Sequence, residues 1–341
     1  MEAYLMTWNK QKRFEALLTG TKADRPIVSG WHHFLDKEQT SADLAEATVE
    51  FAQKYDWDWV KINPRATYLA EAFGNTYDFT DYRWVFPKQT HAVVSSAKDL
   101  PKIEQVDVNN SAPLQEQLEA VRLIRQGLLD TPIIQTLFSP LTILMFLTGN
   151  SSYHDQTMYG SEDPLDFATL LQEDRAGVHR ALHQIATTMA AYIVELDKAG
   201  VDGLFYATTG TAHPKLFDLA TFNEFSRPYD MIVLDAMKKG RILHTCGPHA
   251  DPARFDDYPV EGISWDTEAE GNPDLTISLQ KTKVGGVDHH IFKDSDPAMI
   301  EQQVNKGLQA TKDEPFLLVP NCAVAVDATE EALFTLRNSV K

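Results

Sequence analysis

The stretch DGLFYATTGTAHPKLFDLATFNEFSRPYDMIVLDAMKKGRILHTC, residues 202–246, decides the fold. It begins with the apolar run DGLFYA (202–207) and ends with RILHTC (241–246), and the segment 222–240 between them has helical periodicity. Both runs are almost continuously apolar, which is typical of parallel strands that are buried on both faces. The stretch therefore predicts a strand–helix–strand unit with two parallel strands.

The same alternation extends over the rest of the chain. Six further apolar runs have the length of strands: 26–31, 58–63, 132–138, 261–266, 283–288 and 315–320. Segments with helical periodicity separate or follow them: 40–55, 114–129, 167–200, 296–311 and 329–340. Eight strands alternating with helices predict a closed (β/α)8 barrel, the TIM-barrel fold. An open doubly wound sheet is the alternative, but neither G-x-G-x-x-G nor G-x-x-x-x-G-K-[ST] occurs in the sequence.

The overall composition excludes several classes of protein. The chain of 341 residues is 43% hydrophobic and has a formal net charge of −18, so it offers no cationic footprint for nucleic acid or anionic lipid. The N-terminal stretch MEAYLMTWNKQKRF (1–14) lacks the apolar core of a signal peptide, and no run of about 18 apolar residues could span a membrane. We therefore expect an acidic cytoplasmic protein. No composition break marks a boundary, so residues 1–341 are predicted to form one domain.

Three side chains capable of binding a metal follow two of the predicted strands. His244 and Cys246 end the fifth strand, and residues i and i+2 of a strand point to the same face. Cys322 comes two residues after the eighth strand, and the carboxyl ends of all eight strands meet at one rim of a barrel. Two thiolates and one imidazole are ligands that Zn2+ prefers, and three protein ligands with an open fourth position are typical of a catalytic zinc site.

The two cysteines, the only ones in the chain, have two simpler interpretations. Buried cysteines are usually inert small hydrophobic residues. The pair could also form a disulfide, although disulfides are rare in cytoplasmic proteins. Placement of both cysteines and one histidine at the same rim favours the metal site.

Other polar residues at the predicted rim are candidates for contacting a substrate. His32 and His33 end the first strand, His289 and His290 follow the seventh, and a histidine there can act as an acid, a base or a substrate contact. Tyr206 ends the fourth strand and could line the pocket, although tyrosines are also common packing residues.

Two cations follow the second strand. Lys61 and Arg65 are placed to meet an anionic group of a substrate, and an ordinary salt bridge is the alternative. On the helical segment 167–200, His179 and His183 have an i, i+4 spacing, but the motif is HRALH rather than H-E-x-x-H, so we interpret them as structural or solvent-facing.

Two of the loops that follow predicted strands are long, 64–84 and 147–163, and long loops on a compact barrel are often functional lids. In the second loop, Tyr153, His154 and Asp155 are candidates for the lid itself, with Gly149 and Gly160 flanking them.

Several segments together resemble the uroporphyrinogen decarboxylase superfamily nearly from end to end. They are QKRFEALLTGTKADRPIV (11–28), EAFG (71–74), PKLFDLATFNEFSRPY (214–229), HTCG (244–247), VPNCAV (319–324) and DATEEAL (327–333). An H-x-C motif with a distant cysteine resembles the methylcobamide:thiol methyltransferases of the coenzyme M type. This resemblance implies that His244, Cys246 and Cys322 hold zinc, which activates a thiol that takes a methyl group from a corrinoid on a partner protein.

The decarboxylase branch of the superfamily is the alternative. Its members need no metal and bind a porphyrinogen through arginines and one aspartate. Their arginine-rich segment is absent from SGWHHFLDKEQ (29–39), and in a gap-free alignment Arg65 stands in place of their aspartate. Cys322 stands in place of their histidine. Porphyrinogen decarboxylation is therefore the weaker prediction.

The methyltransferase resemblance leaves some roles open. No D-x-H-x-x-G motif occurs, so a corrinoid must be carried by another protein. Asp266 or Glu268 could occupy the fourth zinc position, although either could equally be an ordinary loop carboxylate. The superfamily often dimerises, which implies a possible homodimer. A non-catalytic barrel that only binds a ligand or a corrinoid protein is a third possibility.

Overall fold

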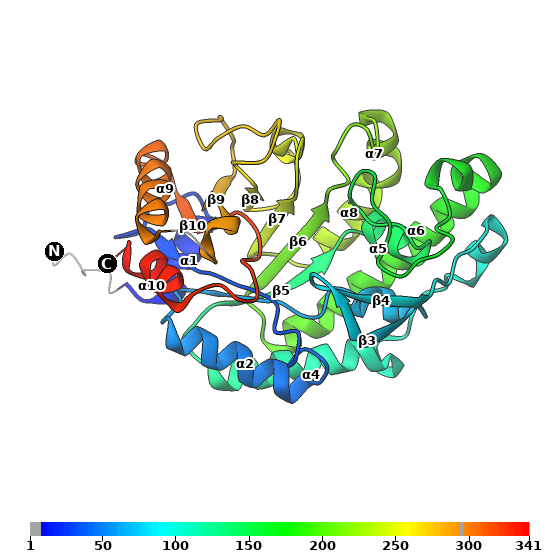
Figure 1. Ribbon diagram of the computed structural model, residues 1–341, viewed down its shortest axis with the longest axis horizontal. Helices are drawn as coiled ribbons and strands as arrows, with labels where there is room; N and C mark the ends of the chain where they lie inside the picture. The colour runs from blue at the N-terminus through cyan, green and yellow to red at the C-terminus, as the bar shows by residue number, and fades with distance from the viewer. Residues whose placement is uncertain (1–7, 294–295, 341) are drawn as a thin grey trace.

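A computed structural model describes residues 8–293 and 296–340, so the first seven residues of the N-terminal stretch 1–14 lie outside the described part (Figure 1). Its main sheet has eight strands, all parallel, in the order β1-β10-β9-β8-β7-β6-β5-β2. They are β1 (Ile27–Val28), β2 (Val60–Ile62), β5 (Ile133–Phe138), β6 (Gly203–Thr209), β7 (Arg241–Thr245), β8 (Gly262–Trp265), β9 (Thr282–Val287) and β10 (Phe316–Pro320). Each coincides with one of the eight predicted strands, so the predicted (β/α)8 barrel is confirmed.

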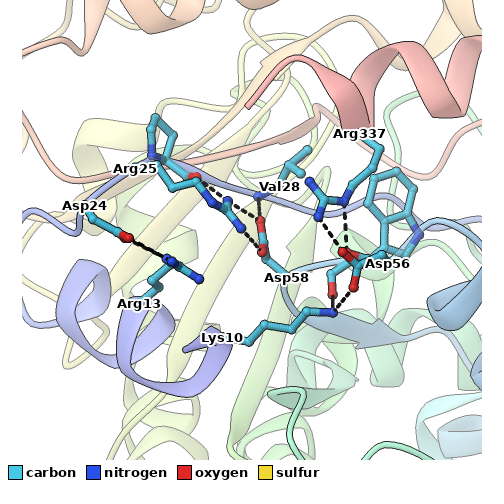
Figure 2. A network of polar contacts seen from close by, with 10 residues as sticks. Lys10, Arg13, Asp24, Arg25, Val28, Asp56, Asp58 and Arg337 are labelled. Carbon is cyan, nitrogen blue, oxygen red and sulfur yellow. Dashed lines mark hydrogen bonds and ion pairs between the residues drawn. The ribbon is translucent and has the colours of Figure 1, made fainter. Parts of the chain in front are cut away.

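The seam between the first and last strands of this order, β1 and β2, is closed by Asp58. The Asp58 amide donates to the carbonyl oxygen of Val28 at 3.0 Å, and the Asp58 carboxylate accepts from the Val28 amide at 3.0 Å. Figure 2 shows Arg25 against the same carboxylate, with N–O distances of 2.8 and 2.6 Å. Because Asp58 is fully buried, this paired guanidinium is needed to offset the desolvation of its charge.

A second carboxylate joins the first and last helices to the same region. Lys10, at the start of α1 (Lys10–Leu18), and Arg337, near the end of α10 (Glu330–Asn338), bind Asp56 at 2.7 and 2.6 Å (Figure 2). Asp56 is largely exposed, so these pairs fix geometry more than they stabilise the fold.

The helices lie around the outside of the sheet (Figure 1). They are α1 (Lys10–Leu18), α2 (Ser41–Lys54), α3 (Tyr68–Ala72), α4 (Ala112–Gly127), α5 (Pro140–Leu147), α6 (Phe167–Ala199), α7 (Leu219–Phe225), α8 (Arg227–Asp235), α9 (Pro297–Ala310) and α10 (Glu330–Asn338). Short 3-10 turns are η1 (Ala97–Lys102), η2 (Val108–Asn110), η3 (Pro252–Phe255) and η4 (His289–Phe292). None of the helices in the described ranges is both long and apolar enough to cross a membrane.

The predicted helix over 222–240 is divided into two. α7 ends at Phe225 and α8 begins at Arg227, with Pro228 in the first turn of α8. Proline has no amide hydrogen to continue the ladder of the preceding helix, whereas it is well tolerated at the start of a new one.

Alternate residues of the strands separate the barrel interior from the layer beneath the helices. The interior cluster comprises Ile27, Trp31, Trp59, Ile134, Phe205, Ile242, Val284, Leu317 and Val319, together with Phe14, Leu17 and Leu18 of α1. Their immediate neighbours, such as Val60 and Leu204, belong instead to the cluster under the helices. Side chains that differ by one position in a strand therefore lie in different compartments.

The long loop predicted over 64–84 is not irregular, and this part of the prediction is wrong. It contains α3 and the whole of β3 (Thr76–Arg83), which forms an antiparallel hairpin with β4 (Phe86–His91). The hairpin residues are mostly half-buried or exposed and carry register shifts, so they lack the continuous apolar runs that identify the barrel strands. The hairpin supports the loop 147–163, because the Gln89 amide donates to the Tyr159 carbonyl oxygen at 2.7 Å.

Candidate metal centre

His244 points into the barrel from the penultimate position of β7. It lies opposite Ser264 on β8, and its Nδ1 is 3.0 Å from the Ser264 hydroxyl oxygen. The ring packs against Phe205 at 5.2 Å between centroids and is 4% exposed. Within the described residues its other nitrogen, Nε2, is buried without a hydrogen-bond partner. Buried polar atoms are nearly always partnered, so Nε2 is available to a ligand.

The two cysteines meet beside this histidine, as predicted. The Sγ atoms of Cys246 and Cys322 are 3.7 Å apart, and both thiols are free and half-buried. This separation is far above the length of a disulfide bond, about 2.0 Å. The donor atoms of His244, Cys246 and Cys322 all lie within 4.8 Å of one another.

This arrangement fits a tetrahedral zinc ion. Two thiolates bound at about 2.3 Å in tetrahedral geometry lie about 3.8 Å from each other, close to the observed sulfur separation. The hydrogen bond between the thiols lowers the pKa of Cys322 well below the usual thiol value, and it raises that of Cys246. The pair thus already favours one thiolate, and soft thiolates with an imidazole suit zinc.

A second polar cluster adjoins the three donors. Asp266, His289 and His290 have ligand atoms within 4.8 Å of one another, and the Asp266 carboxylate is 3.7 Å from Nδ1 of His289. Asn321, the residue before Cys322, donates to Asp266 at 3.0 Å. The two clusters are therefore neighbours, but Asp266 is not part of the three-donor group.

Glu268 faces away from this centre. Its carboxylate pairs with Lys306 at 3.2 Å on the surface. Asp266, in contrast, lies near the thiols, because its negative charge contributes to raising the pKa of Cys246. It is therefore the better placed of the two carboxylates considered for the fourth zinc position.

Tyr153 covers the cysteines from the loop 147–163. A Cβ built at Gly247 would lie 3.3 Å from its ring, and one at Gly210 would lie 2.7 Å from it, so both glycines leave room for the ring. Burial and the neighbouring cysteines raise the pKa of the Tyr153 hydroxyl well above 10.0. His154 stacks on His213 at 5.0 Å and holds the same loop down.

The flanking glycines of this loop have the backbone that the lid prediction requires. Gly149 and Gly160 have φ angles of +78° and +81°, a region that favours glycine. Of residues 153–155, Tyr153 lies beside the cysteines, whereas His154 packs on His213 and Asp155 is exposed, so the lid role of this segment stays a prediction.

Tyr206 does not line the site. Its hydroxyl points out of the barrel and donates to the buried carboxylate of Asp230 on α8, which also accepts from Ser226 and Tyr258. The neighbouring residue, Phe205, occupies the inward position. Successive side chains of β6 point to opposite faces, so Tyr206 points away from the interior that Phe205 enters. The prediction that Tyr206 contacts a substrate is therefore wrong.

The two histidines after β1 are also occupied by local contacts. His32 Nδ1 hydrogen bonds with the carbonyl oxygen of His33, and its ring packs between Phe34 and Phe51 at 4.5 and 4.9 Å. His33 Nδ1 is 3.2 Å from the buried carboxylate of Glu38. Neither is brought to the cysteines by a described contact.

Arg65 forms a buried ion-pair cluster instead of a free anion site. Its guanidinium binds Glu71 at 2.8 Å and also Glu116, and the side chain is 5% exposed. These carboxylates hold the pKa of Arg65 above its usual value despite its burial. The salt-bridge alternative is the one observed.

The helical histidines are structural, as interpreted from their motif. His179 Nδ1 lies 2.7 Å from the Tyr229 hydroxyl and Nε2 lies 3.1 Å from Glu224, while His183 is exposed.

Two residues that orient the centre are absent from the sequence-based candidates. Ser264 holds His244, and Asn321 connects Cys322 to Asp266. Ser264 lies directly opposite His244 in the sheet, so the register of two parallel strands would have identified it, but register is not readable from either strand alone.

The structure thus defines a (β/α)8 barrel with a two-cysteine, one-histidine cluster where strands end, the region in which barrel enzymes carry their active sites. The family model described as uroporphyrinogen decarboxylase matches residues 10–341, and the chain belongs to this family. A uroporphyrinogen decarboxylase of Christiangramia forsetii is 32% identical over 257 residues, covering 67% of this chain and 69% of that protein.

Two solved structures share the fold. A methyltransferase from Methanosarcina mazei superimposes with a TM-score of 0.74 at 17% identity, covering 98% of each chain. A B12-independent methionine synthase from Shewanella sp. W3-18-1 has a TM-score of 0.57 at 12% identity, covering 92% of this chain and 96% of that one. At these identities the likeness shows the fold alone.

Proposed function

We propose that this protein is a zinc-dependent methyltransferase that moves a methyl group from a corrinoid protein to a thiol. The observation that carries the proposal is the partnerless Nε2 of His244 beside two sulfurs 3.7 Å apart. His244, Cys246 and Cys322 would hold the ion. Bound zinc would supply the electrostatic stabilisation that keeps a substrate thiol deprotonated at neutral pH.

The side chains of the chain itself would prepare this site. Ser264 holds Nδ1 of His244 and so directs Nε2 toward the sulfurs. Tyr153 covers Cys246, which excludes water and strengthens electrostatic interactions with an incoming thiol. The fourth ligand position is left for the acceptor thiol, which would attack the methyl group in line.

The comparisons are consistent with the proposal at the level of family and fold. The chain belongs to the uroporphyrinogen decarboxylase family, and the methyltransferase from Methanosarcina mazei has the same fold over 98% of this chain. Because the sequence has no D-x-H-x-x-G motif, we infer that the corrinoid is carried by a separate protein, which would dock over the mouth of the barrel.

A metal-independent carboxy-lyase is the second candidate, favoured by the 32% identity to a uroporphyrinogen decarboxylase. The site argues against it. Arg65 is held by Glu71 and Glu116 and is not free for a carboxylate of a porphyrinogen, and the segment 29–39 contains no arginine.

Metal content and activity of purified variants test the proposal. We expect one zinc per wild-type chain, loss of zinc and of methyl transfer together in Cys246→Ala and Cys322→Ala, and no change in the control His183→Ala. Methylcobalamin as donor and 2-mercaptoethanesulfonate as acceptor provide the assay, with thioether formation as the readout. Metal-free protein that is fully active, or zinc-stripped protein that decarboxylates uroporphyrinogen, would contradict it.

A further inference from the structure

Lys61 is a lysine in the interior of the barrel. On β2 the residues Val60 and Ile62 pack under the helices, whereas Trp59 and Lys61 point inward. The Lys61 ammonium lies over the rings of Trp31, 5.3 Å from its centroid, and Phe205, 4.8 Å from its centroid. Such rings attract a cation, but far less than a carboxylate does.

No carboxylate pairs with this ammonium within the described ranges 8–293 and 296–340. The ammonium donates a hydrogen bond to the side-chain oxygen of Asn63, and the residue is 7% exposed. A buried charge without a counter-charge is costly, so burial lowers the pKa of Lys61 to about 7. The amine is therefore poised between its two protonation states at neutral pH.

The negative groups that act on Lys61 are those of the candidate metal centre. Cys322, after β10, and Cys246, after β7, oppose the lowering of the Lys61 pKa. Phe205 links the two regions, since one of its neighbours is Lys61 and another is His244. His32 lines the same small cavity as Lys61, and burial lowers the pKa of its imidazole.

Lys61 is not placed to touch a substrate. The cavity that it lines with Asn63 and His32 has a volume of about 10 Å³, the lower limit for a single water molecule. Any influence of Lys61 on the centre is therefore electrostatic.

The charge of the centre changes when a thiol binds. Two cysteine thiolates and Zn2+ sum to zero, and a third thiolate makes the total −1. A low-dielectric interior penalises this net charge unless a cation compensates it. A protonated Lys61 provides that cation, and the thiolate in turn provides the counter-charge that the lysine lacks.

We propose that Lys61 takes up one proton when the acceptor thiol loses one on binding, so that the buried site keeps its net charge. The sulfur–hydrogen bond breaks, the sulfur would keep the electron pair at the metal centre, its proton passes to solvent, and the lone pair of the Lys61 amine binds one proton from solvent. Lys61 is thus a charge-compensating, positioning residue. This inference rests on the proposed function.

Proton release on thiol binding tests the inference without any turnover. Cobalt(II)-loaded wild-type protein is titrated with 2-mercaptoethanol, binding is followed by the thiolate-to-cobalt absorption, and calorimetry in two buffers of different ionisation enthalpy counts the protons. We expect more protons to be released per thiol at pH 6 than at pH 8.5, because Lys61 takes up a proton on thiol binding only where its amine was neutral beforehand.

The variant Lys61→Met removes the amine and retains an unbranched apolar side chain, one atom shorter, that can pack on Trp31 and Phe205. It should release about one proton at both pH values and bind the thiol about tenfold or more weakly at pH 8.5. The matched control is Lys283→Met, which removes a buried lysine that has its own carboxylate, Glu314, at 2.6 Å. It should retain the wild-type proton count even where stability falls.

Release of one proton by the wild type at both pH values, or identical proton counts for wild type and Lys61→Met, would overturn the inference. The wild-type measurement stands by itself if Lys61→Met does not fold. A wild-type protein that binds no cobalt or shows no thiolate absorption would contradict the proposed function instead, so the two failures are distinguishable.

Discussion

Nδ1 of His244 lies 3.0 Å from the hydroxyl oxygen of Ser264, its direct neighbour on the adjacent parallel strand. This contact occupies one ring nitrogen and leaves the other, Nε2, as the donor that faces the two cysteines. A ligating histidine whose second nitrogen is held in this way has a defined ring orientation, which is the usual arrangement in protein metal sites.

Removal of this contact should weaken metal binding without abolishing it. For Ser264→Ala we expect zinc affinity to fall about 10- to 100-fold, because the ring is no longer held for ligation. Competition with a fluorescent chelator measures the affinity. Ser339→Ala, at the end of α10, is the control and should bind zinc as the wild type does. Equal affinities for wild type and Ser264→Ala would show that the hydroxyl does not orient the ligand.

The two cysteines should differ in reactivity in metal-free protein. The pKa of Cys322 is lowered and that of Cys246 is raised by their mutual hydrogen bond, and the thiolate is the reactive form. We expect iodoacetamide at pH 7 to modify Cys322 first, as measured by mass spectrometry of the two cysteine peptides. Saturating zinc should protect both. Faster labelling of Cys246 than of Cys322 would contradict the inference that Cys322 has the lower thiol pKa of the two.

Asp230 should make stability depend on pH in an unusual direction. Burial raises its pKa from 3.8 to about 6, although hydroxyl donors from Tyr206, Ser226 and Tyr258 oppose the rise. Because the folded-state value is above the unfolded one, the stabilising contribution is complete below about pH 4 and is lost as the pH rises through 6. Relative to Asp230→Asn, the wild type should lose about 2 kcal/mol of unfolding free energy between pH 4 and pH 7.

Urea unfolding at several pH values measures this difference, and Asp257→Asn is its control. The pKa of Asp257 is lowered by the hydrogen bond from Arg227, so its contribution should be lost as the pH falls, the opposite direction. A difference between wild type and Asp230→Asn that does not vary with pH would disprove the assignment.

Arg65 should matter for stability rather than for the metal centre. Arg65→Met leaves the carboxylates of Glu71 and Glu116 without their partner in a largely buried cluster, which typically costs about 3–5 kcal/mol. We therefore expect a lowered melting temperature with unchanged zinc content, measured by calorimetry and metal analysis. The control is Lys102→Met, which removes the exposed lysine of the Lys102–Asp99 ion pair. It should change neither the melting temperature nor the zinc content. Loss of thiol binding at unchanged stability would instead favour an anion-binding role.

The barrel strands were predictable because each is buried on both faces. RILHTC (241–246) and PFLLVP (315–320) have no polar alternation to obscure them, and β7 and β10 lie within these runs. The β3–β4 hairpin was missed for the converse reason. Its residues are partly exposed and polar, so they carry no apolar run, and their pairing depends on contacts with α5 and the loop after it.

The meeting of the three candidate ligands was also predictable, because parallel strands in a barrel end at one rim wherever they occur in the chain. His244 and Cys246 share a face by their spacing, and Cys322 joins them through the position of β10. What the residues do at that rim depends on their partners, and these come from segments distant in sequence.

The sequence by itself determined the alternation of strands and helices, and with it the barrel and the rim that gathers His244, Cys246 and Cys322. Only the tertiary structure decided which side chains face that centre. Tyr206 points out to Asp230, Arg65 is held by two glutamates, and Lys61 enters the interior without a carboxylate. The physical reason is that inward and outward positions on a strand differ by a single residue, so burial and charge pairing are set by the register and packing of neighbouring elements.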